Sequence, residues 1–178
     1  MIIREARLAD TPLIAQVHVD TWRSAYRGIV PDVKLENLSY DRAEDVARQL
    51  IAGAQSKSFI LVAETTYEIV AFASGGPVRE SEAPETGEVY AIYVLDRHQR
   101  KGVGRLLVKA AVRHLLAQGM RALLVWVLQD NPARAFYERL GGQLLGSKMV
   151  SIAGRDLEEV SYGWNDMAVI LSTGDESS

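Results

Sequence analysis

A short basic turn with two glycines is the part of this chain whose residues could most directly do chemistry. Gly102 and Gly104 have no Cβ, so an oxygen atom can approach the backbone closely and positive φ angles are accessible. If a helix starts here, its first amides have no partner inside the helix and, with the helix dipole, they attract anions. Full positive charges are added by Arg100, Lys101 and Arg105. The turn therefore predicts a site for a phosphate-bearing molecule.

The residues on either side of the turn predict the elements that would position it. Residues 89–95 form an unbroken apolar run, rich in β-branched and aromatic side chains, which is typical of a strand covered on both faces. After the turn, apolar residues recur at helical spacing on one face and basic residues on the other. The apolar positions are Val103, Leu106, Leu107, Ala110, Ala111 and Leu115. A strand, a glycine turn and a helix in this order give the layout of an anion site built from backbone amides.

Known phosphate-binding patterns narrow down the ligand of this turn. A P-loop needs Gly-Lys-Ser/Thr and a Rossmann fingerprint needs a third glycine near Leu107, and the sequence has neither. The run from Gln99 to Gly104 instead resembles the Gln/Arg-x-x-Gly-x-Gly/Ala signature of the GNAT superfamily of N-acetyltransferases. The resemblance implies that the pyrophosphate of acetyl-CoA is bound by Gln99, Arg100, Lys101, Gly102, Val103, Gly104 and Arg105. Without a second motif, a turn that merely starts a basic-faced helix fits these residues equally well.

A second match to the same superfamily lies in residues 123–142. From the residues alone, this segment predicts another buried strand, and then a helix with Asn131 as its N-cap and Pro132 at its first position. Gly141 can end that helix in a left-handed conformation. The segment resembles the companion motif of the family. Two family motifs in the right order favour the GNAT assignment over a simple glycine turn.

The companion motif implies functional roles for three of its residues. In the family, the asparagine that corresponds to Asn131 contacts the pantetheine arm of acetyl-CoA, and Phe136 belongs with it to the implied cofactor-binding residues. The tyrosine of the motif, here Tyr137, lies near the sulfur atom and can protonate the departing thiolate. Taken alone, Asn131 is explained as a helix cap, and Tyr137 as a core residue with a satisfied hydroxyl.

The order of elements along the chain matches the same family. Strands are predicted at about residues 2–8, 58–64, 68–74, 89–95, 123–128, 142–152 and 157–164, with helices starting near Thr11, Tyr40, Val103 and Asn131. Asp10 can cap the first of these helices. The resemblance implies an α/β (α+β) protein with the GNAT fold, a mixed and mostly antiparallel sheet of about seven strands with helices on both faces. We expect one domain over residues 1–168 and a polar tail over residues 169–178.

The fourth strand acquires two functions from the resemblance. In GNAT proteins the fourth and fifth strands splay apart at a bulge, acetyl-CoA enters the gap, and strand backbone pairs with its pantetheine arm. The corresponding backbone here is that of Ile92, Tyr93 and Val94. A glutamate that accepts the amine proton is often found at the start of this strand, so Glu88 is the candidate base; it is otherwise a solvated residue that begins a strand.

The implied activity is transfer of an acetyl group from acetyl-CoA to a primary amine of a small molecule or a protein, within a ternary complex. Tyr26 and Arg27 lie in the loop that borders the acceptor site in this fold, and they could bind an acceptor with an apolar part and a carboxylate. The resemblance is also compatible with a homodimer. Three other readings share the motifs: an acyl-CoA-binding sensor without turnover, a transferase of a longer acyl group, and a nucleotide-binding regulator.

Composition excludes several other classes of protein. With 178 residues and 48% hydrophobic content the chain suits one compact domain, and its net charge of −3 gives no general attraction to nucleic acid or to an anionic membrane. The absence of cysteine rules out an acetyl-cysteine intermediate, and the three histidines show no metal-ligand spacing, so no metal is predicted. Neither a signal sequence nor a membrane-spanning run is evident, so a cytoplasmic protein is expected.

Overall fold

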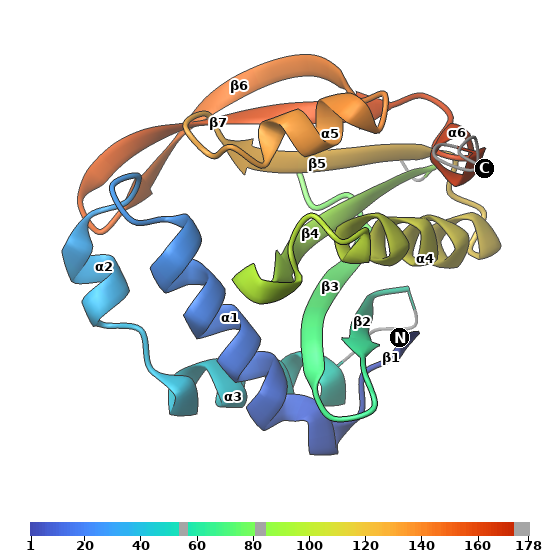
Figure 1. The fold of residues 1–178 in the computed structure, drawn as a ribbon. Helices are drawn as coiled ribbons and strands as arrows, with labels where there is room; N and C mark the ends of the chain where they lie inside the picture. The colour runs from blue at the N-terminus through green and yellow to red at the C-terminus, as the bar shows by residue number, and fades with distance from the viewer. Residues whose placement is uncertain (54–56, 81–84, 173–178) are drawn as a thin grey trace.

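The computed structural model describes residues 1–53, 57–80 and 85–172, and within them seven strands form one sheet (Figure 1). In chain order the strands are β1 (Ile2–Glu5), β2 (Phe59–Glu64), β3 (Ile69–Pro77), β4 (Thr86–Val94), β5 (Ala122–Leu128), β6 (Gln143–Ile152) and β7 (Arg155–Trp164). Their order in the sheet is β1-β2-β3-β4-β5-β7-β6. The β4–β5 pair is parallel and the other neighbours are antiparallel. The predicted mixed, mostly antiparallel sheet is confirmed.

Helices cover both faces of the sheet, as predicted (Figure 1). They are α1 (Thr11–Ala25), α2 (Asp32–Glu36), α3 (Tyr40–Ala52), α4 (Val103–Ala117), α5 (Arg134–Arg139) and α6 (Val169–Ser172), with short 3₁₀ turns at Leu8–Asp10 and Asp96–His98. α1 and α3 pack together on one face, while α4 and α6 pack on the other. In the described part of the chain no helix is long and apolar enough to span a bilayer.

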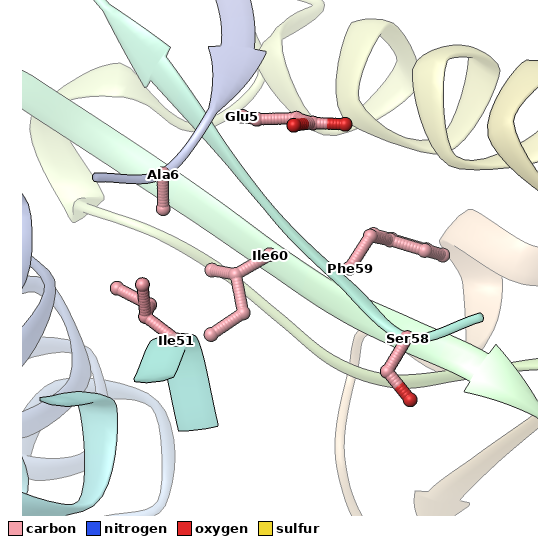
Figure 2. Close-up of a pocket in the computed structure, with 6 residues that line it drawn as sticks. All are labelled: Glu5, Ala6, Ile51, Ser58, Phe59 and Ile60. Carbon is pink, nitrogen blue, oxygen red and sulfur yellow. The ribbon is translucent and has the colours of Figure 1, made fainter. Parts of the chain in front are cut away.

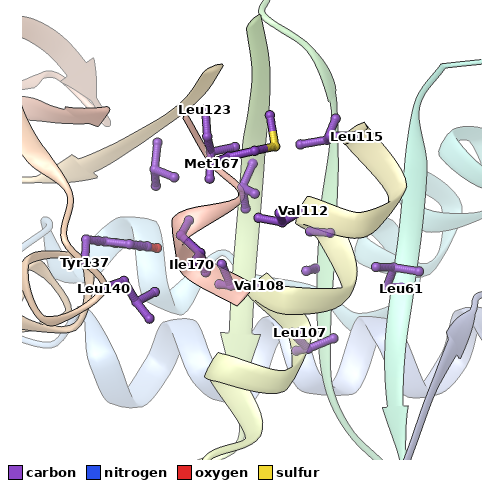
Figure 3. Close-up of a cluster of buried hydrophobic side chains, with 14 of the residues drawn as sticks. Leu61, Leu107, Val108, Val112, Leu115, Leu123, Tyr137, Leu140, Met167 and Ile170 are labelled. Carbon is purple, nitrogen blue, oxygen red and sulfur yellow. The ribbon is translucent and has the colours of Figure 1, made fainter. Parts of the chain in front are cut away.

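The core has a large cluster on the α4 face of the sheet. Leu107, Val112 and Leu115 of α4 are buried against strand residues such as Leu123, and Tyr137 and Leu140 close the cluster from the α5 side (Figure 3). A smaller cluster on the opposite face joins α1 and α3 to the sheet; it includes Ile14, Val17, Ala47, Val62, Phe72 and Leu95. Because both faces of β4 are covered over part of its length, its sequence is an apolar run without alternation.

Three sequence-based expectations need correction. Asp10 does not cap α1 with its side chain; its carboxylate accepts instead from Arg4 Nη1 at 2.7 Å and from the backbone N–H of Arg7. The short helix α2 was not predicted, because five residues carry too little periodicity to be recognised. Residues 169–172 form α6, whose Ile170 is buried in the α4-side core, so ordered structure continues past the predicted boundary at 168. Residues 173–178 of the predicted tail lie outside the described residues.

Candidate functional site

The candidate site lies at the point where the strands β4 and β5 separate. These strands are paired only over Thr86–Val89 and Ala122–Val125. On the other side of β4, the register to β3 shifts so that Gly75 faces Val89 and Ser74 faces Ala91, which leaves Tyr90 as the extra residue of a β-bulge. Beyond the bulge β4 continues along β3, whereas β5 continues along β7. The strands therefore separate after Val89, as the family resemblance implied (Figure 1).

The open edge of β4 offers backbone polar groups to this gap. The N–H of Leu95 donates to Val70 O at 3.0 Å, so it faces β3. Since successive residues of a strand direct their backbone groups to opposite edges, the N–H groups of Ile92 and Val94 face the gap. Gln99 Nε2 donates to Val94 O at 3.0 Å, which ties the basic turn to the end of the strand. By the same alternation, the backbone N–H of Tyr93 faces β3.

The basic turn has the backbone geometry that an anion site requires. Arg100 and Gly102 have φ angles of 57° and 83°, and this left-handed path leads the chain into α4. The first hydrogen bond of α4 runs from Leu106 N to Gly102 O at 3.0 Å, so the preceding amides have no partner in the helix. A Cβ on Gly102 would meet no atom within 4 Å. The space in front of these amides is open, and the exposed Arg100 and Lys101 lie beside it.

The two sequence motifs meet at the start of α4. A Cβ on Gly104 would lie 3.4 Å from the ring of Phe136, so the glycine lets α5 pack against the basic turn. Asn131 is 8% exposed, and its Oδ1 accepts from the N–H of Ala133 at 2.9 Å. This bond closes the turn before α5, which starts only at Arg134 with Ala133 as its N-cap, so Asn131 is not the helix N-cap that was predicted. Gly141 has a φ of 82° and ends the helix as predicted.

The hydroxyl of Tyr26 interacts with Asn131 and with the hydroxyls of Tyr93 and Tyr137. Burial raises the pKa of Tyr26, Tyr93 and Tyr137, and charge interactions with Tyr26 raise the pKa of the other two further. Hydrogen bonding with Asn131 and Tyr93 acts in the opposite direction on the pKa of Tyr26. Tyr93 Oη also accepts from Trp22 Nε1 at 2.9 Å. Phenols with raised pKa values stay protonated at neutral pH, which is the form that can donate a proton.

Tyr137 is 5% exposed and belongs to the α4-side core, so the interpretation as a buried residue also holds. Its ring contacts those of Phe136 and Tyr162, with centroid distances of 5.3 and 6.1 Å. Arg27, by contrast, is exposed in the turn after α1 and makes no hydrogen bond or ion pair with the residues that the structure describes. The structure thus brings Tyr26, Tyr93, Asn131 and Tyr137 together, and leaves Arg27 outside that group.

Glu88 is buried, not solvated: its side chain is 2% exposed. One carboxylate oxygen accepts from the backbone N–H of Arg79 at 3.0 Å, and the other accepts from the Arg79 guanidinium, with Nε at 3.1 Å. Arg79 in turn lies over the ring of Tyr90, 4.5 Å from its centroid. The hydroxyl of Tyr90 donates to Pro77 O at 2.6 Å. Glu88 and the bulge residue are therefore held in one network with Arg79.

Four residues near the gap were missed from the sequence. They are Arg79, Trp126, Lys148 and Glu159. Lys148 Nζ lies 4.2 Å from the centroid of the Trp126 ring and is paired with Glu80 at 2.7 Å. Burial raises the pKa of the Glu159 carboxyl. The alternation of polar and apolar residues in β6 and β7 could have indicated that these strands carry site residues. Only strand register shows which of the polar residues face the gap.

A separate hollow lies at the other end of the sheet (Figure 2). It is lined by Glu5, Ala6, Ile51, Ser58, Phe59 and Ile60. None of the residues predicted for the site lines it, so the candidate site is the β4–β5 gap. Within the described ranges, no group of three or more His, Cys, Asp or Glu side chains is placed to hold a metal ion.

Comparisons with known proteins agree with this geometry. The model of the acetyltransferase (GNAT) family matches residues 19–142, which include both motifs. YuaI, an uncharacterized N-acetyltransferase of Bacillus subtilis, is 36% identical over 168 residues, 94% of this chain and 95% of that protein.

Two solved structures share the fold at low sequence identity. The ribosomal-protein-alanine N-acetyltransferase of Brucella melitensis superposes with a TM-score of 0.71 at 21% identity, covering 92% of this chain and 99% of that one. The PaiA N-acetyltransferase of Thermoplasma acidophilum, solved in complex with coenzyme A, has a TM-score of 0.71 at 18% identity, with 92% and 98% coverage.

Proposed function

The chain belongs to the acetyltransferase (GNAT) family and is an acyltransferase, and from this premise we propose that it acetylates a primary amine directly from acetyl-CoA. One observation carries the proposal: the two family motifs, far apart in the sequence, pack together at Gly104 and Phe136 beside the opened β4–β5 gap. Because the chain has no cysteine, the acetyl group cannot pass through an acetyl-cysteine.

The residues at the gap fit acetyl-CoA, which supplies an activated acetyl thioester when it is bound. The amides that follow Gly102 would receive its pyrophosphate, with Arg100 and Lys101 as counter-charges, and the open space at the Gly102 Cβ position supports this assignment. The N–H groups of Ile92 and Val94 would pair with the pantetheine arm. Asn131, whose side-chain Oδ1 accepts from the N–H of Ala133, would contact the same arm.

The side chains around the gap can then manage the protons of the reaction. An amine is protonated at neutral pH, so one proton must leave before nitrogen can attack the thioester carbonyl. A second proton must reach the sulfur as CoA departs as a thiol. We propose Tyr137 as the donor of that proton, since burial raises its pKa and keeps its hydroxyl protonated. Holding amine and thioester together contributes the rest of the acceleration, up to about 7–11 kcal/mol in well-oriented reactions.

We retain Glu88 as a proposed base for the amine, provided that its hydrogen bonds to Arg79 can break. Both of its oxygens already accept hydrogen bonds from Arg79, so neither is free to approach the amine. Glu88 can therefore take a proton from the amine only if Arg79 releases it. For the acceptor, Tyr26 is the better supported of the two proposed contacts, because its hydroxyl interacts with Asn131 and Tyr93, whereas Arg27 is exposed.

An acceptor screen tests the proposal. The protein is mixed with acetyl-CoA and, in turn, benzylamine, putrescine, free amino acids, an alanine-ended peptide and a lysine peptide. Release of the CoA thiol is followed over time, and the masses of the products are measured by mass spectrometry. We expect amine-dependent thiol release and a matching acetylated product for at least one class. Thermal protection by CoA together with no release across the panel would instead support an acyl-CoA sensor without turnover. Parallel runs with propionyl-CoA and succinyl-CoA identify a preference for a longer acyl group.

A further inference from the structure

Strand register places a set of polar and aromatic side chains on the sheet face opposite α4. Val125, Val127 and Val160 pack in the α4-side core, so their neighbours in β5 and β7 point to the other face. Glu159 pairs in register with both Leu128 and Lys148, and Glu88 pairs with Leu124. We call the side chains of Glu88, Trp126, Leu128, Lys148 and Glu159 the acceptor face.

Both cations near the acceptor face are bonded to carboxylates other than Glu159. Arg79 is paired with Glu88, and Lys148 is paired with Glu80 at 2.7 Å while it lies over Trp126. The carboxylate of Glu159 makes no hydrogen bond or ion pair with any residue in 1–53, 57–80 or 85–172. Among the described residues, it is the partly buried carboxylate of this face whose charge is left without a direct partner. A buried charge without a partner is costly, so a cationic ligand is the natural complement.

The charge of Glu159 also acts on one of the tyrosine hydroxyls at the gap. Its charge raises the pKa of Tyr26, the residue that interacts with both Asn131 and Tyr93. The charged groups that act on Glu159 itself are Lys148 of β6, Arg79 and Glu80 after β3, and Glu88 of β4. Leu128 and Leu157 beside it pack with Tyr26 and Leu35. A carboxylate beside the apolar residues Leu128 and Leu157 and the aromatic ring of Tyr26 suits an amine that carries an apolar group.

We propose that Glu159 binds the ammonium group of the acceptor and removes its proton, an assignment that rests on the proposed acetyltransferase function. In this step an N–H bond of the ammonium breaks and an O–H bond forms on the Glu159 carboxylate. The electron pair stays on nitrogen, which becomes the neutral nucleophile. Glu159 later returns the proton to solvent. The acceptor is a cationic primary amine with an apolar part, and a carboxylate next to its amine is unfavourable because it would face Glu88 and Glu159.

The opposing explanation is that Glu159 only balances Lys148 across the β6–β7 pair. The two residues are direct cross-strand partners, and a surface pair of this kind contributes at most about 1 kcal/mol to stability. That role predicts a small change in stability and no change in catalysis. The two explanations therefore give different results in the same variant.

The test uses the amine with the highest kcat/KM in the acceptor screen and the variant Glu159→Gln, which keeps the shape and removes the charge. Glu158→Gln is the matched control, because Glu158 is the neighbouring exposed residue on the opposite face of the same strand. We expect Glu159→Gln to lower kcat/KM about 100-fold or more, as loss of a general base does, and Glu158→Gln to leave it within twofold. Glu159→Asp should retain part of the activity.

A binding measurement separates this inference from the proposed function. Calorimetry of the same amine with the CoA-saturated protein should show at least tenfold weaker binding for Glu159→Gln and wild-type binding for Glu158→Gln. Wild-type kcat/KM and amine affinity in Glu159→Gln would overturn the role of Glu159 and leave the acetyltransferase assignment intact. A wild-type protein that acetylates no amine overturns both.

Discussion

The two sides of the β4–β5 gap are built in different ways. The side proposed to bind the cofactor, called the cofactor side, is made of backbone: the amides after Gly102, the left-handed residue Arg100 and the open edge of β4 beyond Val89. The side proposed to bind the amine, called the acceptor side, is made of side chains from strands that are distant in the sequence, such as Trp126 and Glu159. Backbone geometry depends little on which side chains surround it, whereas a side-chain surface can be exchanged residue by residue. This difference fits a family that keeps one acyl donor and varies its acceptors.

The largest expected effect lies on the cofactor side. Gly102→Val adds a β-branched side chain at a φ of 83°, in the space proposed for the pyrophosphate. Loss of two charge-assisted hydrogen bonds there should raise the CoA dissociation constant about 1000-fold in a calorimetric titration.

Gly119 provides a matched control for that substitution. It has a φ of 84° and, like Gly102, nothing within 4 Å of its Cβ position, but it lies at the far end of α4. Gly119→Val should cost a similar amount of stability, about 1–2 kcal/mol from the left-handed strain, with unchanged CoA affinity. Equal CoA affinity in the two variants would mean that the turn is not the phosphate site.

The next largest effect is expected for Tyr137, which we propose acts between the bound cofactor and the acceptor. Tyr137→Phe should lower kcat about 100-fold, because the buried hydroxyl that can protonate the thiolate is removed. The CoA dissociation constant should stay within threefold of the wild-type value. A thiol with a lower pKa leaves without help, so an acyl donor made from such a thiol should reduce the defect. An unchanged kcat with acetyl-CoA would leave Tyr137 as a core residue only.

A third prediction distinguishes a structural Glu88 from a catalytic one. Arg79→Met leaves the buried Glu88 carboxylate without its cation and should destabilise the protein by about 2 kcal/mol, reduced from the fully buried case because Arg79 is half-exposed. The double variant Arg79→Met/Glu88→Gln should recover most of that loss in urea unfolding. If Glu88→Gln alone abolishes turnover while the amine still binds, Glu88 is the base and Glu159 is not.

The smallest effect concerns pH and belongs to the acceptor side. Burial raises the pKa of Glu159, so its carboxylate is available as a base only above that raised value. As the pH falls through it, the carboxyl becomes protonated and kcat/KM should fall about tenfold per pH unit. Glu159→Gln should have a low kcat/KM without this acidic limb. If kcat/KM of Glu159→Gln still falls at acidic pH as in the wild type, the titration belongs to a group other than Glu159.

Sequence reasoning predicted the backbone geometry of single turns and helix starts well because these signals are local. The left-handed conformations of Gly102 and Gly141 depend on a few residues each, and α3 starts at Tyr40 as predicted. The fold followed from the order of such elements. Expectations that depended on distant partners were less successful. Asp10 was predicted to cap α1, but its carboxylate accepts a hydrogen bond from Arg4, and the start of α5 was placed two residues early.

The residues of the acceptor side could not be predicted from the sequence, because the local residue pattern does not determine strand register. Glu159 faces Lys148 and Leu128 only through the pairing of β7 with both of its neighbours, and a shift by one residue would turn it to the other face. The pairing of the buried Glu88 carboxylate depends on Arg79, nine residues earlier in the chain. The sequence therefore indicated which cofactor to expect before it could indicate which residues meet the acceptor.

The division between the two sides is tested most directly by a calorimetric titration of CoA into the Glu159→Gln variant. If the cofactor side is built from backbone and the acceptor side from side chains, the CoA dissociation constant stays within twofold of the wild-type value while amine acetylation is lost. A CoA affinity at least tenfold weaker than that of the wild type would contradict the account, because it would show that Glu159 supports the cofactor site.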